Sequence, residues 1–218
     1  ASQAILAGYL RGTVPHGQGL QRVLQVFRER GDLAEAVRRE RLPLPVPAPA
    51  PVRGRQATDA ATPVRRDLLP GFTHLGSIDL FDAAWQPLGE VFRDLGPDVV
   101  VDAGRLGHHG MPAGLAASAD LVGLVCRTSL VSLAGVRVHL QALVDAAPPG
   151  RCGLVLVGPG RPYEASEVAE QFGVPVVARI AWDPRAADDL AHGEASGRWH
   201  RTPLARSLAA AAIELSGR

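Results

Sequence analysis

The sequence predicts an α/β protein in which a doubly wound, mostly parallel sheet carries helices on both faces. Two observations lead to this prediction. From residue 70 onward, short apolar runs alternate with longer segments of helical spacing, and this alternation is typical of strands joined by crossover helices. Several runs are almost wholly apolar, as strands buried on both faces must be. We therefore expect right-handed crossovers, with ligands at the carboxyl ends of the strands.

The candidate strands share this apolar character and are bounded by turn residues. They are residues 72–76, 98–102, 121–126, 152–157 and 174–180. Helices are predicted between them, at 79–95, 130–147, 163–172 and 185–192, and a last one at 203–216. The last helix aligns Leu204, Leu208 and Leu215 on one side, with Arg206 as its internal cation. This pattern favours core packing over a membrane anchor.

The amino-terminal part has a different pattern. Apolar residues at three-and-four spacing over 18–41 predict one or two amphipathic helices, divided at Gly31 and Asp32. Alternate prolines between residues 42 and 64 favour an extended polyproline II conformation, hence a linker or a long exposed loop. We accordingly predict a helical part at 1–41, a Pro/Ala-rich linker or loop at 42–66, and an α/β core at 67–218.

Length and composition limit the class of protein. The chain has 218 residues, of which 46% are hydrophobic and 21% charged, so it can bury a globular core. No apolar run reaches the roughly 18 residues that a membrane-spanning helix needs, and the sequence opens without a signal-peptide pattern. We expect a cytoplasmic protein. Cys126 and Cys152 lie in apolar runs and are predicted to be reduced packing residues.

All 23 basic side chains counted as Lys or Arg are arginine. The chain therefore contains no ammonium group for a Schiff base or for the phosphate-binding motif G-x-x-x-x-G-K-[ST]. Residues 1–66 carry 11 arginines against 5 acidic residues. A basic segment of this kind suits contact with DNA, with a membrane surface, or with neither if it is a solvated helix face.

The stretch GPDVVVDAGRLGHHG places Asp102 at the end of a predicted strand and Gly104 in the glycine-rich loop that follows. A carboxylate there can hold Mg²⁺, while glycine lets backbone amides approach a phosphate. Aspartate is also common at strand ends as a cap or turn residue. Arg105, His108 and His109 lie on the same loop, but adjacent histidines need not converge, so we expect no metal site from that pair.

Two further strand exits carry candidate residues. In CGLVLVGPGRPY, Pro159 and Arg161 follow a strand among glycines, where the loop can wall a nucleobase or simply turn the chain. In ARIAWDPRAADDLAHG, Asp183 and Pro184 follow another strand. An aspartate cap followed by proline at the first helical position explains this second motif structurally.

The order of these pieces between Leu68 and Leu215 resembles the carboxyl-terminal two-thirds of the MinD/ParA family of deviant-Walker P-loop ATPases. The matching stretches are DVVVDAG, ADLVGLVCRTSLVSLAGV, CGLVLVG, FGVPVVARIAWDPRAADDLAHGEA and RTPLARSLAAAAIEL. The resemblance implies a P-loop NTPase-like fold that binds ATP and Mg²⁺. It also implies a homodimer, a protein partner in a positioning, partition or secretion system, and in some members peripheral attachment to the membrane.

Carried over by position, the resemblance makes Asp102 the Walker B acid that assists Mg²⁺ and the attacking water. Gly104 becomes the glycine whose amide senses the terminal phosphate. Pro159 and Arg161 fall in the base-contacting loop. Asp183 and Pro184 form a second wall of the adenine pocket.

One departure from the family is large, because its opening strand and lysine-bearing phosphate loop have no counterpart in this sequence. We expect the sequence to start after that loop, and the alternative is a relative that has lost it. In either case these residues alone are predicted not to hydrolyse ATP. The predicted function is a MinD/ParA-like ATPase acting as a positioning or partitioning switch; the alternative is a non-catalytic scaffold or localisation module. A Rossmann enzyme is disfavoured because its glycine fingerprint is missing.

Overall fold

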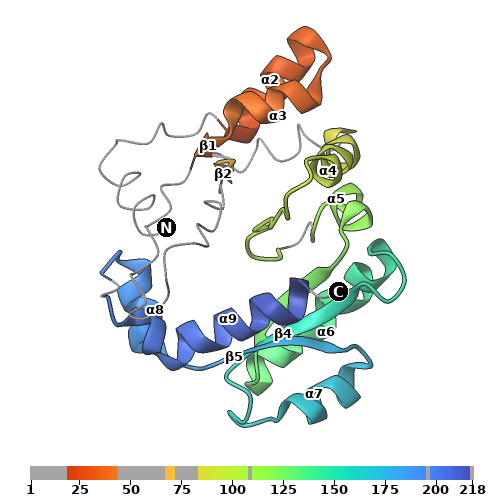
Figure 1. Ribbon diagram of the computed structural model, residues 1–218. Coiled ribbons are helices and arrows are strands. Elements are labelled where there is room, and N and C mark those ends of the chain that lie inside the picture. Colours follow the sequence, from red (N-terminus) through yellow and green to blue (C-terminus); the bar gives the residue numbers. More distant parts are fainter. Residues whose placement is uncertain (1–18, 44–66, 72–82, 108–109, 195–196, 217–218) are drawn as a thin grey trace. The chain divides into compact units, whose positions relative to one another are not determined.

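The computed structural model describes residues 19–43, 67–71, 83–107, 110–194 and 197–216. The chain divides into two compact units, Ala1–Phe81 and Asp82–Arg218 (Figure 1). Each unit has helices and a sheet of its own, two-stranded in the first and three-stranded in the second.

The first unit contains two helices, α2 (Gly19–Arg30) and α3 (Leu33–Glu40). The predicted division between them is confirmed: Gly31 has a left-handed φ of 72°, which glycine adopts without steric cost. Asp32 then caps α3 by accepting a hydrogen bond from the backbone N–H of Glu35 at 2.9 Å. The helices are in contact with one another, and Val23 and Val37 are fully buried.

The two ends of the proline-rich segment lie side by side. Strand β1 (Leu42–Pro43) pairs antiparallel with β2 (Asp67–Leu68), and the guanidinium of Arg41 lies 3.4 Å from the carboxylate of Asp67. Residues 67–68 therefore lie in the first compact unit, Ala1–Phe81, whereas the sequence predicts an α/β core that starts at residue 67. The residues at the two ends of the proline-rich segment thus pair within one unit; residues 44–66 lie outside the described residues.

The second unit alternates helices with strands. In chain order its elements are α4 (Trp85–Asp94), α5 (Ala113–Ser118), β3 (Val122–Arg127), α6 (Leu130–Ala146), β4 (Cys152–Val157), α7 (Ala165–Phe172), β5 (Val176–Ile180), α8 (Pro184–Ala191), the short 3₁₀ helix η3 (Trp199–Arg201) and α9 (Pro203–Ser216). The sheet order is β3-β4-β5, and both pairs are parallel. This confirms the α/β class and the parallel sheet that the sequence predicts.

Helices cover both faces of this sheet (Figure 1). On one face, Leu140 of α6 and Val168 of α7 pack with Leu154 and Leu156 of β4 in a buried core. On the other face, helices α8 and α9 supply a second core with β5; its buried members are Ala178, Ile180, Ala186, Leu204 and Ala211. The sheet is therefore doubly wound, as predicted, because helices pack on both of its faces. Strand β4 lies at the centre of the sheet because β3 and β5 pair with its two edges.

The predicted strand at 98–102 is wrong. These residues form no strand, and the side chain of Val100 is 95% exposed. A β-branched run becomes a strand only when a neighbour accepts its backbone hydrogen bonds, and no segment within the described ranges pairs with this one. The predicted strand at 72–76 lies outside the described residues, and the sequence did not predict the short helix α5.

Strand β3 is buried on one face only, which differs from the expectation for a central parallel strand. Val122 and Cys126 are buried, whereas Val125, which points to the opposite face, is 64% exposed. Alternate residues of a strand face opposite sides of a sheet. The second core reaches Val155 and Val157 of β4 and does not extend to β3.

Both cysteines are free and buried, which confirms their predicted role in packing. Desolvation by burial raises the pKa of the Cys126 thiol to about 11, so this group is neutral near pH 7. The last helix packs as predicted in part: Leu204 and Ala211 are buried in the second core, whereas Leu208 is 38% exposed. Among the helices in the described ranges, none is long and apolar enough to cross a membrane.

The central position of β4 leads to a prediction about stability. Leu154 is fully buried in β4, so Leu154→Ala should lower the free energy of unfolding by about 3 kcal/mol through lost burial and a cavity. The matched substitution Leu130→Ala removes a side chain that is 68% exposed and should change it by less than about 0.5 kcal/mol. Urea denaturation followed by circular dichroism measures both, and equal effects would contradict this account of the core.

Candidate functional site

The loops that follow β3, β4 and β5 meet at the carboxyl edge of the sheet, around Gly158. The backbone N–H of Gly158 donates to the carbonyl of Ile180 at the end of β5, at 2.8 Å. Its own carbonyl accepts a hydrogen bond of 2.6 Å from Oγ1 of Thr128, which follows β3. One residue therefore joins the exits of all three strands, at the edge where open α/β sheets bind ligands.

Thr128 holds this edge together from within the protein. Among the described residues, Thr128 is the one polar residue that is buried, and none of its surface is exposed. Besides the bond to Gly158, its hydroxyl lies 3.2 Å from the carbonyl of Arg161. A buried hydroxyl that has its partners stabilises the structure, whereas a carbonyl left unpaired costs about 1–3 kcal/mol. Thr128 thus fixes where the loop after β4 can lie.

Gly158 is required for two separate reasons. Its φ of 72° lies in the left-handed region that favours glycine. A Cβ atom at this position would also lie 3.1 Å from Cβ of Trp182, which is tighter than ordinary van der Waals contact, and 3.4 Å from Cδ of Arg161. The absence of a side chain lets Trp182 and Arg161 approach the end of β4.

Arg127 and Trp182 form a stack across the end of β4. The guanidinium carbon of Arg127, the last residue of β3, lies 4.6 Å from the ring centroid of Trp182, which follows β5. At this distance the cation is attracted to the face of the indole, an interaction worth about 0.5–1 kcal/mol when exposed. Trp182 remains 37% exposed, so the aromatic surface adjoins solvent.

Two arginines lie at this edge of the sheet, together with the carboxylates of Glu164 and Asp183. In the described part of the chain, neither Arg127 nor Arg161 has a carboxylate within 4.0 Å of its guanidinium. A planar guanidinium without an anionic partner suits bidentate binding of phosphate or carboxylate oxygens. The arrangement therefore offers two positive groups beside an aromatic surface, which fits a ligand with a planar ring and a negative charge.

The predicted base-pocket residues lie at or next to this edge. Pro159 and Arg161 follow β4, as predicted, and Arg161 contacts the Gly158 region. Asp183 is the cap of α8: its Oδ1 accepts from the N–H of Ala186 at 3.2 Å, and Pro184 occupies the first turn of that helix. The structural explanation given for these two residues is thus present in the fold.

Among the described residues, no hydrogen bond or ion pair links Asp102 or Gly104 to the edge around Gly158. Asp102 is exposed, and its Oδ1 accepts from the N–H of Gly104 at 2.8 Å. This is a local turn of the kind that aspartate favours. Gly104 has a left-handed φ of 73°.

The residues present fit Mg²⁺ and ATP only in part. Asp102 offers a single carboxylate, which is compatible with Mg²⁺ held mainly by water and phosphate oxygens. No group of three His, Cys, Asp or Glu side chains that would hold a metal by itself occurs in the residues described; His108 and His109 lie outside them. The edge around Gly158, with its indole and its glycines, matches the base of a nucleotide better than the described residues match its phosphates.

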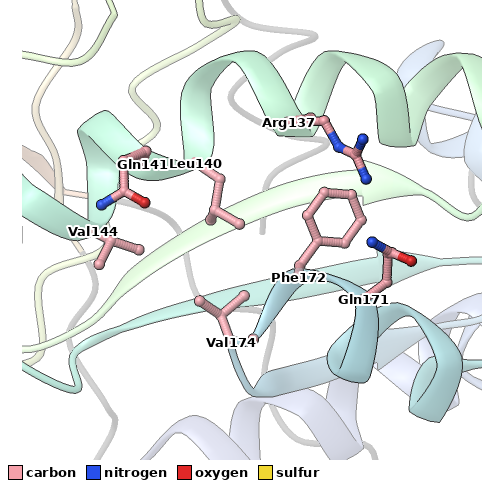
Figure 2. A pocket seen from close by; sticks show the side chains of 8 residues that line it. Arg137, Leu140, Gln141, Val144, Gln171, Phe172 and Val174 are labelled. Carbon is pink, nitrogen blue, oxygen red and sulfur yellow. The ribbon is translucent and has the colours of Figure 1, made fainter.

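A separate recess of about 320 Å³ lies between α6 and the end of α7 (Figure 2). Leu140, Val144, Phe172 and Val174 form its apolar wall. Val174 precedes β5, so the recess lies toward the amino end of that strand, away from the edge where parallel sheets bind ligands. It is therefore not the candidate site.

The arginines of the first unit are partly neutralised by their neighbours. Arg39 and Arg38 lie 2.6 and 3.0 Å from the carboxylate of Glu35, and their hydrogen bonds, that of Arg39 first, lower the pKa of Glu35. Arg22 lies 4.0 Å from Glu40. These pairs are what a solvated helix face is expected to show.

Comparison with known proteins adds the fold relationship. Neither a protein-family model nor a curated protein matches the sequence. Among solved structures, a ParA family ATPase from Chlorobium tepidum TLS matches with a TM-score of 0.53 and 20% identity, over 68% of this chain and 62% of that chain. The MinD cell division protein of Aquifex aeolicus matches with a TM-score of 0.53 and 14% identity, over 70% and 64%.

The chain has a ParA/MinD-like fold. This confirms the fold relationship that the sequence motifs predict. The chain spans 62% and 64% of the length of these two ParA and MinD structures, so the similarity concerns part of a ParA/MinD-like architecture.

Sequence reasoning missed three residues that build the site: Thr128, Arg127 and Trp182. Each one ends or follows a strand, and this position was the signal available for finding them. What it did not reveal is that β3 and β5 are both neighbours of β4, which brings Arg127 and Trp182 together over Gly158.

The role of Thr128 can be tested directly. Thr128→Val keeps the shape of the side chain and removes the donor, so it should lower the free energy of unfolding by about 2 kcal/mol, because the Gly158 carbonyl loses its partner. Thr128→Ser keeps the hydroxyl and should lose about half of that or less. Thermal unfolding measures stability, and amide hydrogen exchange of residues 158–161 reports on the loop. Unchanged exchange in Thr128→Val would contradict the role given to Thr128.

Proposed function

We propose that this chain forms the base-binding part of a ParA/MinD-like nucleotide-dependent switch, with ATP as the nucleotide. The observation that carries the proposal is the meeting of three strand exits around Gly158. It occurs at the carboxyl edge of a parallel sheet and presents an exposed indole with two arginines that have no carboxylate within 4.0 Å in the described ranges. A nucleobase needs a flat apolar surface and a close backbone, and phosphates need unpaired cations.

The phosphate end is proposed to be completed by polypeptide outside these 218 residues. Support comes from surfaces that a nucleotide domain of this fold would cover. Val125 on β3 is 64% exposed and Val100 is 95% exposed, although both belong to apolar runs that parallel sheets bury. A strand added at the free edge of β3, together with the crossover helix that joins it, would cover the exposed face of β3 and bring a phosphate-binding loop to the carboxyl edge.

Within this proposal each predicted site residue has a defined role. Pro159 and Arg161 form one side of the nucleotide site beside Gly158, and Asp183 and Pro184 fix the start of α8 next to that site. When bound, Mg²⁺ neutralises phosphate charge. Asp102 would hold it through its free carboxylate oxygen, and the Gly104 amide would contact the terminal phosphate once its bond to Asp102 is released.

The biological role proposed with this chemistry is the positioning or partition of a cellular cargo by a homodimer that responds to ATP, in the cytoplasm or at the membrane surface. The structures that share the fold are a ParA family ATPase and a MinD cell division protein, and this likeness is what supports the role. Contact with DNA or membrane through the arginines of the first unit remains part of the proposal.

A second candidate is a non-catalytic scaffold or localisation module. Two observations favour it: the sequence contains no lysine, and one carboxylate oxygen of Asp102 already accepts a hydrogen bond of 2.8 Å from the Gly104 N–H of its own loop. A scaffold of this fold would keep the packed sheet and a partner surface without turning over nucleotide.

Nucleotide binding and hydrolysis separate the two candidates. The protein expressed from the complete reading frame should bind ATP with Mg²⁺ at micromolar concentrations and hydrolyse it, whereas the 218-residue chain should bind only at millimolar concentrations because it lacks the lysine and loop that hold the phosphates. In the complete protein, Asp102→Ala should slow hydrolysis by about tenfold or more.

Asp98→Ala is the matched control, since Asp98 is an exposed carboxylate of the same segment. Calorimetric titration and phosphate release measure binding and turnover. Equal turnover in both variants would remove Asp102 from the mechanism. A complete protein that neither binds nor hydrolyses ATP would leave the scaffold as the function.

A further inference from the structure

The stack of Arg127 on Trp182 is an unusual use of an exposed aromatic surface. The indole lies at the ligand edge of the sheet, yet a guanidinium of the same chain already covers it at 4.6 Å. Guanidinium and nucleobase are both flat groups that favour an aromatic face. The same surface can therefore be occupied by either one.

We propose that Trp182 is the stacking surface for the nucleobase and that Arg127 covers this surface until a nucleotide displaces it. The inference rests on the proposed function in one respect, namely that the ligand is a nucleotide. It assigns specific tasks to two residues outside the predicted base pocket: Trp182 recognises the ring, and Arg127 makes recognition of the ring depend on the charge of the ligand.

On the face of the indole that Arg127 covers, a nucleobase can stack only if the guanidinium moves away. The guanidinium carbon lies 4.6 Å from the indole centroid, and a ring inserted between the two would need about twice a normal stacking separation. A nucleobase that stacks on this face of the indole therefore takes the place of the Arg127 guanidinium.

Arg127 is free to move because little holds its side chain. Its backbone N–H is anchored by the Ser132 hydroxyl at 3.0 Å, while its guanidinium has no carboxylate partner among the residues that the structure describes. The stacking that is lost is worth about a two- to fivefold change in affinity. A phosphate group repays this loss, since a guanidinium binds it with charge-assisted hydrogen bonds.

This arrangement makes a neutral nucleoside and a nucleotide respond differently to one substitution. Adenosine can displace Arg127 from the indole but offers the guanidinium no anion. Adenosine binding therefore loses the free energy of the Arg127–Trp182 contact without compensation. ADP displaces the same group and then binds it. Arg127→Ala should therefore strengthen adenosine binding about two- to fivefold and weaken ADP binding by about fivefold or more. A merely structural role for Arg127 would not produce opposite changes.

The experiment uses the whole 218-residue chain with Trp85→Phe and Trp199→Phe, so that Trp182 is the single tryptophan. Adenosine, ADP and inorganic triphosphate are titrated separately, with Trp182 fluorescence and equilibrium dialysis as readouts. Adenosine and ADP should quench Trp182 by stacking, and triphosphate should not. Trp182→Ala should lower the affinity for adenosine about tenfold, whereas Trp182→Phe, which keeps an aromatic ring, should retain most of it.

Arg137→Ala is the matched control for charge, because Arg137 is also exposed but lies in α6 beside the recess of Figure 2. It should change neither affinity by more than about twofold. Circular dichroism and thermal unfolding establish that each variant is folded; if Trp182→Ala is not, Trp182→Phe and Arg127→Ala still test the proposal.

Two results would overturn the inference. One is adenosine binding that is absent, or that is unchanged by Trp182→Ala. The other is an Arg127→Ala variant in which adenosine and ADP affinities change in the same direction. If dialysis still shows ADP bound in such a case, the proposed function stands without this inference. Conversely, adenosine quenching in this chain together with no ATP hydrolysis by the complete protein would support the inference and remove the ATPase.

Discussion

The parallel hydrogen bonding of β4 to both β3 and β5 is the constraint on which the rest of this structure depends. It aligns the carboxyl ends of three strands that are far apart in the sequence. The loops that follow then begin at one edge of the sheet, and the buried hydroxyl of Thr128 fixes the loop after β4 to the end of β3. Without this pairing there would be no shared edge, and the candidate site would be three unrelated turns.

Glycine at the end of β4 turns this alignment into a site. Gly158 provides the left-handed turn and leaves the space into which Trp182 and Arg161 extend. Because β4 presents no side chain there, Arg127 from β3 reaches the indole that follows β5. The same small residue therefore serves the backbone, the packing and the surface offered to a ligand, so its replacement would disturb all three together.

The cations of the candidate site are arginine side chains, because arginine takes the place of lysine throughout this sequence. Arginine remains charged at physiological pH and lies flat on aromatic rings, which lysine does less well. The edge is thus suited to recognising planar rings and anions, while the compact ammonium that phosphate loops use is missing from the chain.

The sequence by itself determined the α/β class, the strands at 152–157 and 174–180 to within a few residues, the helix break at Gly31 and the cap at Asp183. These depend on local patterns of apolar spacing, glycine and capping residues. Only the tertiary structure decided that Asp98–Asp102 forms no strand, that β3 is buried on one face, and that Arg127 meets Trp182. Strand formation, burial and contacts between loops depend on which segments become neighbours in space. The spacing of apolar residues along the chain does not specify those neighbours.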